Sequence, residues 1–335
     1  MSGRGGPARP RARGAQYGPS VGGVLAVGPR TRRFRCHRAL AGAAGAVLSG
    51  PPSSVSAGEV GLASPHRESE EDITSMMGPS HAACGAAAWV ALTADYQLRL
   101  QGLSIPIGWG LLDVGDAGVL TGALVTAGAA LLPDLDHPGG TVARSLRPLS
   151  TWLSRGICRL SGGHRRGTHS VLGVLAFTGL AAGAQKIGIP VGDLGRVWPL
   201  AAVMSVLLIA FAVQVLAFVP ERVAKLNWVV GIGLGVVVGL YPPAHEWWFA
   251  AAVGTGVAAH LAGDLVTTRG IHLLYPLRMP LPLPRSVYKN RSFLTVPLIG
   301  NAGSAAELAL LAPITLFALT GLWGAFALAT GLVVA

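Results

Sequence analysis

Long uncharged apolar segments constrain this chain more than any other feature of its sequence. Residues 198–219 are 22 consecutive positions without a charged side chain, and residues 308–335 are 28. An α-helix needs about 20 predominantly apolar residues to cross the hydrocarbon core of a bilayer. Similar segments recur along the chain, which predicts an all-α, polytopic transmembrane bundle of about seven helices. The expected helices cover residues 82–94, 117–132, 169–189, 198–219, 227–244, 247–265 and 308–335.

The composition and the placement of charge agree with a membrane protein. Only 12% of residues are charged, whereas soluble domains average about 25%. The net charge of +11 is explained in part by basic loops at 141–168, 221–226 and 269–291, which alternate with neutral or acidic loops. Because cytoplasmic loops carry this excess of Lys and Arg, we expect a multi-pass protein of the plasma (inner) membrane with these loops in the cytoplasm. The charge therefore does not indicate a specific nucleic-acid partner.

The first 75 residues differ from the rest, being rich in Gly, Arg, Pro and Ser and lacking sustained apolar periodicity. Two interpretations remain open. Residues 1–75 are either a disordered basic cytoplasmic tail or a gene-model artefact, with translation beginning at Met76 or Met77. The apolar run that follows Met77-Gly-Pro-Ser-His81 favours the artefact. The membrane-embedded domain then comprises residues 76–335.

With this topology, four polar clusters fall near the cytoplasmic ends of the predicted helices. They are His81, the run Asp134-Leu135-Asp136-His137, the run from His164 to Ser170, and the pair His260 and Asp264. His260 and Asp264 are four residues apart, so a helix places both on one face. Ionisable residues inside apolar spans indicate function by default. The alternative is a His–Asp hydrogen bond that only joins helices.

Smaller details of these clusters carry further expectations. Asp134 and Asp136 repel each other unless a cation or proton lies between them; the alternative is an ordinary Asp-rich turn. Thr168 is expected to cap the third predicted helix, with His169 in its first turn. Thr267, one turn beyond Asp264, is a candidate partner that orients a ligand.

Imidazole and carboxylate groups together suit Zn, Mn or Fe as divalent ions. The number of ligands is sufficient for one or two ions, and a two-metal site supports displacement at phosphorus. Arg165 and Arg166 either clamp a phosphate or only determine topology. Cys36, Cys84 and Cys158 lack the spacing of a thiolate zinc site.

At these residues the chain resembles the YdjM-type family of inner-membrane proteins. The matching segments are Met77-Gly-Pro-Ser-His81, Leu131-Leu-Pro-Asp-Leu-Asp-His-Pro138, His164-Arg-Arg-Gly-Thr-His-Ser170, and His260-Leu-Ala-Gly-Asp264-Leu-Val-Thr267 continuing through Gly270 and His272 to Tyr275-Pro276. The resemblance implies a metal-dependent hydrolase. The order His, Asp, His, then His-x3-Asp is also loosely similar to zinc-dependent phospholipase C and P1-type nucleases, which suggests a phosphoester substrate.

We therefore predict a metal-dependent hydrolase that acts on a small-molecule or lipid substrate at the cytoplasmic face, with membrane lipid as its surroundings. Asp136 or His137 is expected to take a proton from the attacking water, or to be a further ligand. One alternative is an ion- or proton-coupled transporter that uses the same cluster. The other is a non-catalytic membrane scaffold whose basic face docks a cytoplasmic partner. The sequence carries no signal of oligomeric state. The predicted metal ligands are His81, Asp134, His164, His169, His260 and Asp264.

Overall fold

The computed structural model describes residues 78–335 except 101, 193–194, 217–223, 241, 244, 279–281, 290–291, 301–303 and 333–335. The predicted tail at 1–75 and the predicted start at Met76 or Met77 lie outside the described residues. Residues 221–223 of the basic loop 221–226 lie outside them as well.

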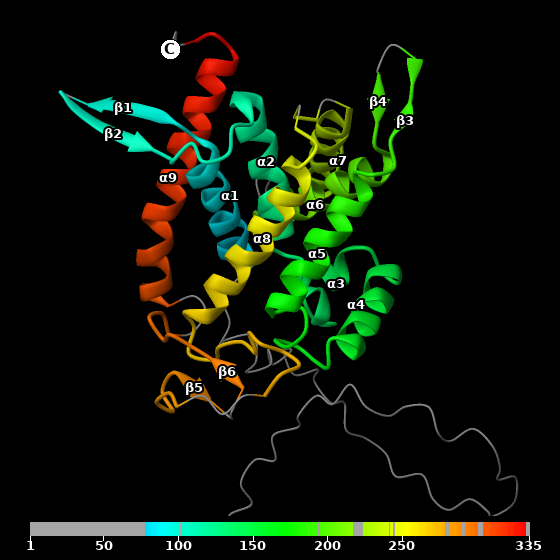
Figure 1. The fold of residues 1–335 in the computed structure, drawn as a ribbon, viewed down its shortest axis with the longest axis vertical. Helices are drawn as coiled ribbons and strands as arrows, with labels where there is room; N and C mark the ends of the chain where they lie inside the picture. The colour runs from blue at the N-terminus through cyan, green and yellow to red at the C-terminus, as the bar shows by residue number, and fades with distance from the viewer. Residues whose placement is uncertain are drawn as a thin grey trace, which may run out of the picture. The chain divides into compact units, whose positions relative to one another are not determined.

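Helices make up most of the described part of the chain (Figure 1). Seven of the α-helices fall on the seven predicted ranges, and they are α1 (Gly78–Thr93), α2 (Gly115–Ala129), α5 (Val171–Ala184), α6 (Pro199–Leu216), α7 (Ala224–Leu240), α8 (Trp248–Leu265) and α9 (Ala305–Ala329). Three described segments are long and apolar enough to cross a membrane, namely Gly115–Asp136, Pro199–Leu216 and Ala305–Ala329. Val171–Ala184 and Leu226–Leu240 are apolar but shorter.

The count of about seven helices was too low, because the described residues form nine α-helices. The two additional helices are α3 (Thr141–Ser145) and α4 (Leu149–Leu160), both inside the basic segment that we expected to be a connecting loop. Their apolar residues are too few for a span, so a search for long apolar runs does not find them. Between α2 and α3 lies a 3-10 turn, η2 (Pro133–Asp136).

In the described residues, three antiparallel hairpins form in the connections between helices. Strand β1 (Tyr96–Leu100) pairs with β2 (Leu103–Ile107), and β3 (Ile189–Pro190) pairs with β4 (Arg196–Val197). Strand β5 (Tyr288–Lys289) pairs with β6 (Phe293–Leu294). Each of these sheets has two strands, so the described fold remains helical in class.

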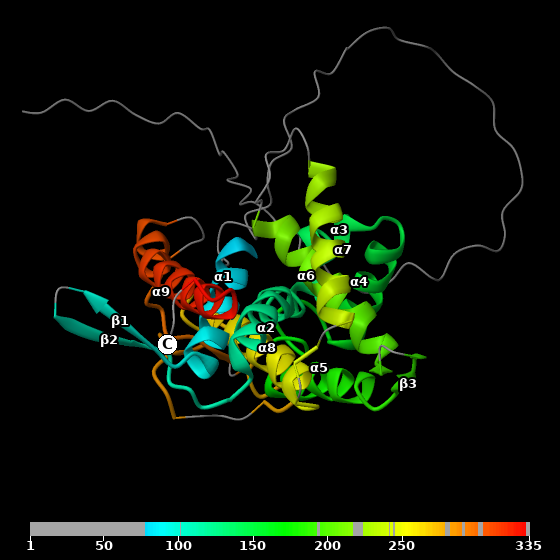
Figure 2. The same cartoon turned by 90° about the horizontal axis from the view of Figure 1, so that it is seen from above.

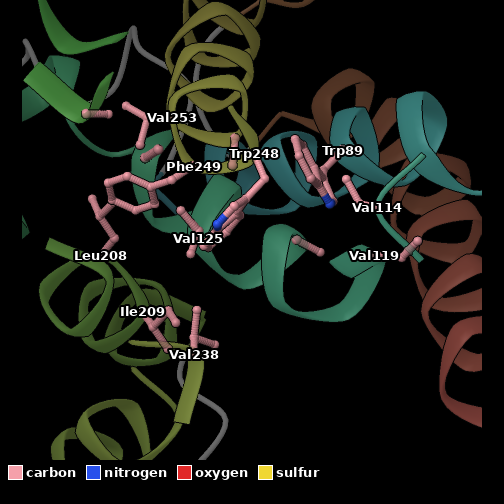
Figure 3. Close-up of a cluster of buried hydrophobic side chains, with 14 of the residues drawn as sticks. Trp89, Val114, Val119, Val125, Leu208, Ile209, Val238, Trp248, Phe249 and Val253 are labelled. Atoms are coloured by element: carbon pink, nitrogen blue, oxygen red, sulfur yellow. The ribbon is translucent and has the colours of Figure 1, made fainter. Parts of the chain in front are cut away.

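Helices α2 and α8 lie at the centre of the bundle, with α1 and α9 on one side and α5, α6 and α7 on the other (Figure 2). The buried core between them contains Trp89, Val125, Leu208, Phe249 and Val253 (Figure 3). Small residues let the central helices approach closely, as is usual between membrane helices. This packing fixes the end of α2 against the last turns of α8.

Replacing Gly256 with alanine is expected to weaken this packing. A Cβ atom at Gly256 would lie 2.4 Å from the Thr126 carbonyl oxygen and 2.8 Å from the Ala129 Cβ, so α8 would have to move away from α2. Overpacking of this kind costs about 1–3 kcal/mol, which thermal unfolding in detergent would detect. Gly233→Ala in α7 is the matched control, because its Cβ would meet no atom within 4 Å. Equal stability of the two variants would contradict the close approach of α2 and α8.

Candidate metal centre

The four predicted polar clusters meet at one end of the helices, where α1 begins and where α2 and α8 end. His81 lies in the first turn of α1, η2 supplies Asp134 and Asp136, and the loop before α5 supplies His164 and His169. Helix α8 supplies His260 and Asp264. The side chains of His81, His169, His260 and Asp264 are almost fully buried, whereas those of Asp134 and His164 are 32% and 23% exposed. The site is therefore closed on most sides and open at Asp134 and His164.

Five side chains direct potential ligand atoms toward one another. His169 Nε2 lies 3.5 Å from both Asp134 Oδ1 and Asp264 Oδ2. His260 Nε2 lies 3.8 Å from the same Asp134 oxygen and 3.6 Å from the same Asp264 oxygen. His81 Nε2 lies 3.6 Å from the other Asp264 oxygen, Oδ1. Ligands about 2.0–2.2 Å from a tetrahedral zinc ion lie roughly 3.3–3.6 Å apart. The separations between His169, His260 and Asp264 therefore fit one divalent ion, with His81 and Asp134 close enough to compete for the remaining positions.

The orientation of two imidazoles provides a second test of this fit. His260 Nδ1 lies 2.6 Å from the Ala130 carbonyl oxygen, so it donates its proton there. His169 Nδ1 faces the Asp136 carboxylate, at 3.4 Å from Oδ2. In the neutral rings both Nε2 atoms then carry lone pairs, and these atoms lie 3.1 Å apart. Two lone pairs at this distance repel each other, whereas a cation accepts both.

Asp136 holds histidines rather than facing the opening. Its Oδ1 lies 2.6 Å from His164 Nδ1, and its Oδ2 accepts a short hydrogen bond from the Thr168 hydroxyl. The carboxylate is fully buried. Carboxylates that orient a ligating or reacting imidazole through its second nitrogen are common around metal sites. Asp136 is placed to do this for His164 and His169.

Arg165 closes the inner side of the cluster. Its backbone adopts the left-handed conformation, with φ of 62°, and its guanidinium is buried. Nη2 lies 2.7 Å from Asp264 Oδ1, and Nη1 donates to the Thr267 hydroxyl and the Gly270 carbonyl at 3.4 and 3.2 Å. Arg165 thus holds Asp264 in place, and the expected partner Thr267 also belongs to this network.

The charges of these groups do not balance. Three carboxylates, from Asp134, Asp136 and Asp264, face one buried guanidinium, that of Arg165. With neutral histidines, the cluster carries two more negative than positive charges. A buried charge is costly unless it is paired. One divalent cation would balance this excess.

His164 joins a second group of potential ligands. Its ring, with Asp134 and His169, forms a set whose ligand atoms lie within 4.8 Å of one another. Two other sets overlap with it, His81 with Asp134 and His260, and His169 with His260 and Asp264. Shared members mean that these are parts of one centre.

Other predicted residues lie around this centre or outside it. The half-buried His137 ring lies 4.8 Å from the ring of His164, at the open side. His272 lies apart: burial lowers its pKa, and its Nε2 contacts the Leu277 carbonyl oxygen at 3.0 Å. The prediction that Thr168 caps the third predicted helix was wrong, because Ser170 caps α5 by accepting from the Gly173 amide. The Thr168 hydroxyl is committed to Asp136 instead.

Sequence reasoning missed one buried acid beside the centre. Glu307, in the first turn of α9, accepts a hydrogen bond of 2.6 Å from the Ser80 hydroxyl, next to His81. The two residues are 227 positions apart, so no local pattern joins them. The only sequence signal was an acid at the start of a long apolar helix.

The fold and the cluster together define a helical membrane protein with a buried His/Asp centre at one end of its helices. The chain belongs to the YdjM inner membrane protein family, whose model matches residues 76–332. The predicted resemblance is thereby confirmed. No curated protein and no solved structure matched the chain in the same comparisons.

Proposed function

We propose that this protein is a membrane-bound, metal-dependent hydrolase of phosphoesters. The single observation that carries the proposal is the convergence of His169 Nε2 and His260 Nε2, 3.1 Å apart, on the carboxylates of Asp134 and Asp264. His81, Asp134, His169, His260 and Asp264 would hold one ion of Zn, Mn or Fe, and His164 would complete a site for a second. When bound, such an ion polarises a phosphoryl oxygen and makes water more acidic.

The protein side chains divide the remaining tasks between them. Arg165 fixes the carboxylate of Asp264, and the Ala130 carbonyl fixes the ring of His260. At the opening, His164 is oriented by Asp136, and its ring has a nitrogen within 4.8 Å of ligand atoms of Asp134 and His169. With one ion bound, His164 would take a proton from the attacking water, with Asp136 acting through it. With two ions bound, the same nitrogen would instead be a ligand of the second ion.

The topology belongs to the same proposal. Seven spans, formed by α1, α2 and α5–α9, would place the centre at the cytoplasmic face. The support is the alternation of basic and non-basic loops, because segments 141–168 and 269–291 carry Arg and Lys without an acid. Both segments adjoin the centre, one before α5 and one after α8.

The metal content of the detergent-purified full chain tests the proposal. We expect one or two equivalents of Zn, Mn or Fe by mass spectrometry, and their loss from the His260→Ala, Asp264→Ala double variant. The control is His245→Ala, because His245 precedes α8 at the end opposite the cluster. The loaded protein should also hydrolyse a chromogenic phosphodiester, and chelation should abolish this activity.

The two assays separate the alternatives. Absence of metal from the wild type after supplementation would overturn the centre itself. Metal without hydrolysis of any phosphoester would reject the enzyme and favour ion transport or a scaffold.

A further inference from the structure

Helix α4 has an unusual distribution of side chains for a helix that packs on a protein. Its apolar residues Leu149, Trp152, Leu153 and Leu160 follow the spacing of one helical face. All four are exposed: Trp152 by 74% and Leu160 by 87%. The face turned toward the protein carries Ser150, Ser154 and Cys158, which are buried. A helix on a water-exposed protein surface would bury its apolar face and expose its polar one, which is the reverse of what α4 does.

The place of α4 in the chain and its packing indicate its depth in the membrane. Helix α4 follows α2 and η2 and precedes α5. It therefore lies near the level at which α2 ends and α5 begins (Figure 1). It packs directly on η2, and Ile157 joins a buried cluster with Leu135 and Val142. Its depth in the membrane is therefore tied to that of η2, which carries Asp134.

The basic residues around α4 indicate which kind of surface covers its apolar face. Arg155 and Arg159 are exposed beside the apolar face, Arg144 and Arg147 are exposed just before the helix, and segment 141–168 contains no acid. Helices with an apolar face and flanking Arg lie in the headgroup layer and prefer anionic lipids. Each basic residue near an anionic surface strengthens binding roughly fivefold.

We propose that α4 is an interfacial helix that lies in the headgroup layer of an anionic leaflet, with Leu149, Trp152, Leu153 and Leu160 among the acyl chains. Arg155 and Arg159 contact the lipid phosphates. Bound lipid headgroups then lie beside η2 and the open side of the centre. This placement depends on the membrane location of the chain and does not require that the centre hydrolyses its ligand.

The test uses the full chain in lipid nanodiscs, with an environment-sensitive fluorescent amino acid at position 153. The control carries the same label at position 155, on the opposite edge of α4. Brominated acyl chains should quench the label at 153 more strongly than that at 155, and iodide in the aqueous phase should do the reverse. In the 153-labelled protein, emission should shift to the blue when zwitterionic lipid is replaced by anionic lipid. Arg155→Gln with Arg159→Gln should remove that shift.

Two results would overturn the inference. Quenching of the 153 label by iodide as strong as that of the 155 label would place the apolar face in water. Protection of the 153 label from both quenchers would mean that a protein surface, such as a second copy of the chain, covers the face. Neither result depends on whether the centre binds metal or hydrolyses a substrate.

Discussion

Replacing Arg165 with methionine is expected to lower the free energy of unfolding of the metal-depleted protein by about 3–5 kcal/mol. The guanidinium and the Asp264 carboxylate lie 2.7 Å apart, and both side chains are 2% exposed. Removing the cation leaves a buried carboxylate without its partner and leaves the Gly270 carbonyl without a donor. Thermal unfolding in detergent after chelation measures the loss. Arg166→Met is the matched control, because it removes the same charge from the neighbouring, half-buried position.

Metal should reduce the effect of Arg165→Met. An ion held by Asp264 supplies positive charge to the same carboxylate, so the loss of stability should be smaller in the metal-loaded protein than in the chelated one. An identical loss under both conditions would mean that Asp264 is not a ligand. A stability equal to that of Arg166→Met would contradict the buried ion pair itself.

The helices were predictable because lipid imposes a strong pattern on sequence. A span needs a long apolar run, and all seven predicted runs coincide with a helix. Helix α4 was missed for the same reason, since its apolar residues are spaced along one face and separated by Ser and Arg. Such a helix is stabilised by its surroundings, and a search for continuous apolarity does not detect it.

The composition of the centre was predictable where it depended on periodicity and topology. His260 and Asp264 lie on one face of α8 as their spacing required, with Nε2 and Oδ2 3.6 Å apart. The roles of Arg165 and Asp136 were not predictable in the same way. The inward turn of Arg165 depends on a left-handed backbone conformation, and such a conformation is uncommon for a residue other than glycine. The burial of Asp136 depends on the His164 loop folding over η2.

His164→Ala is expected to lower the turnover of a phosphodiester by about 10²–10⁴-fold while one equivalent of metal remains bound. The expectation follows from the two environments of the ring. Nδ1 lies 2.6 Å from the buried Asp136 Oδ1, which orients the imidazole, and 23% of the side chain is exposed at the opening. Asp136 itself is fully buried, so in the proposed mechanism it would act on the substrate only through His164. Added imidazole should restore part of the lost activity.

His137→Ala tests whether His137, as the sequence first suggested, takes the proton from the attacking water in place of His164. The two rings lie 4.8 Å apart on the same side of the centre, so both are near a substrate that enters there. A loss of turnover confined to His137→Ala would transfer the proton-accepting role to His137. A fall from two metal equivalents to one in His164→Ala would make His164 a ligand of the second ion, together with Asp134 and His169. In that case imidazole should restore metal binding and activity together, whereas a proton acceptor regains activity with its metal content unchanged.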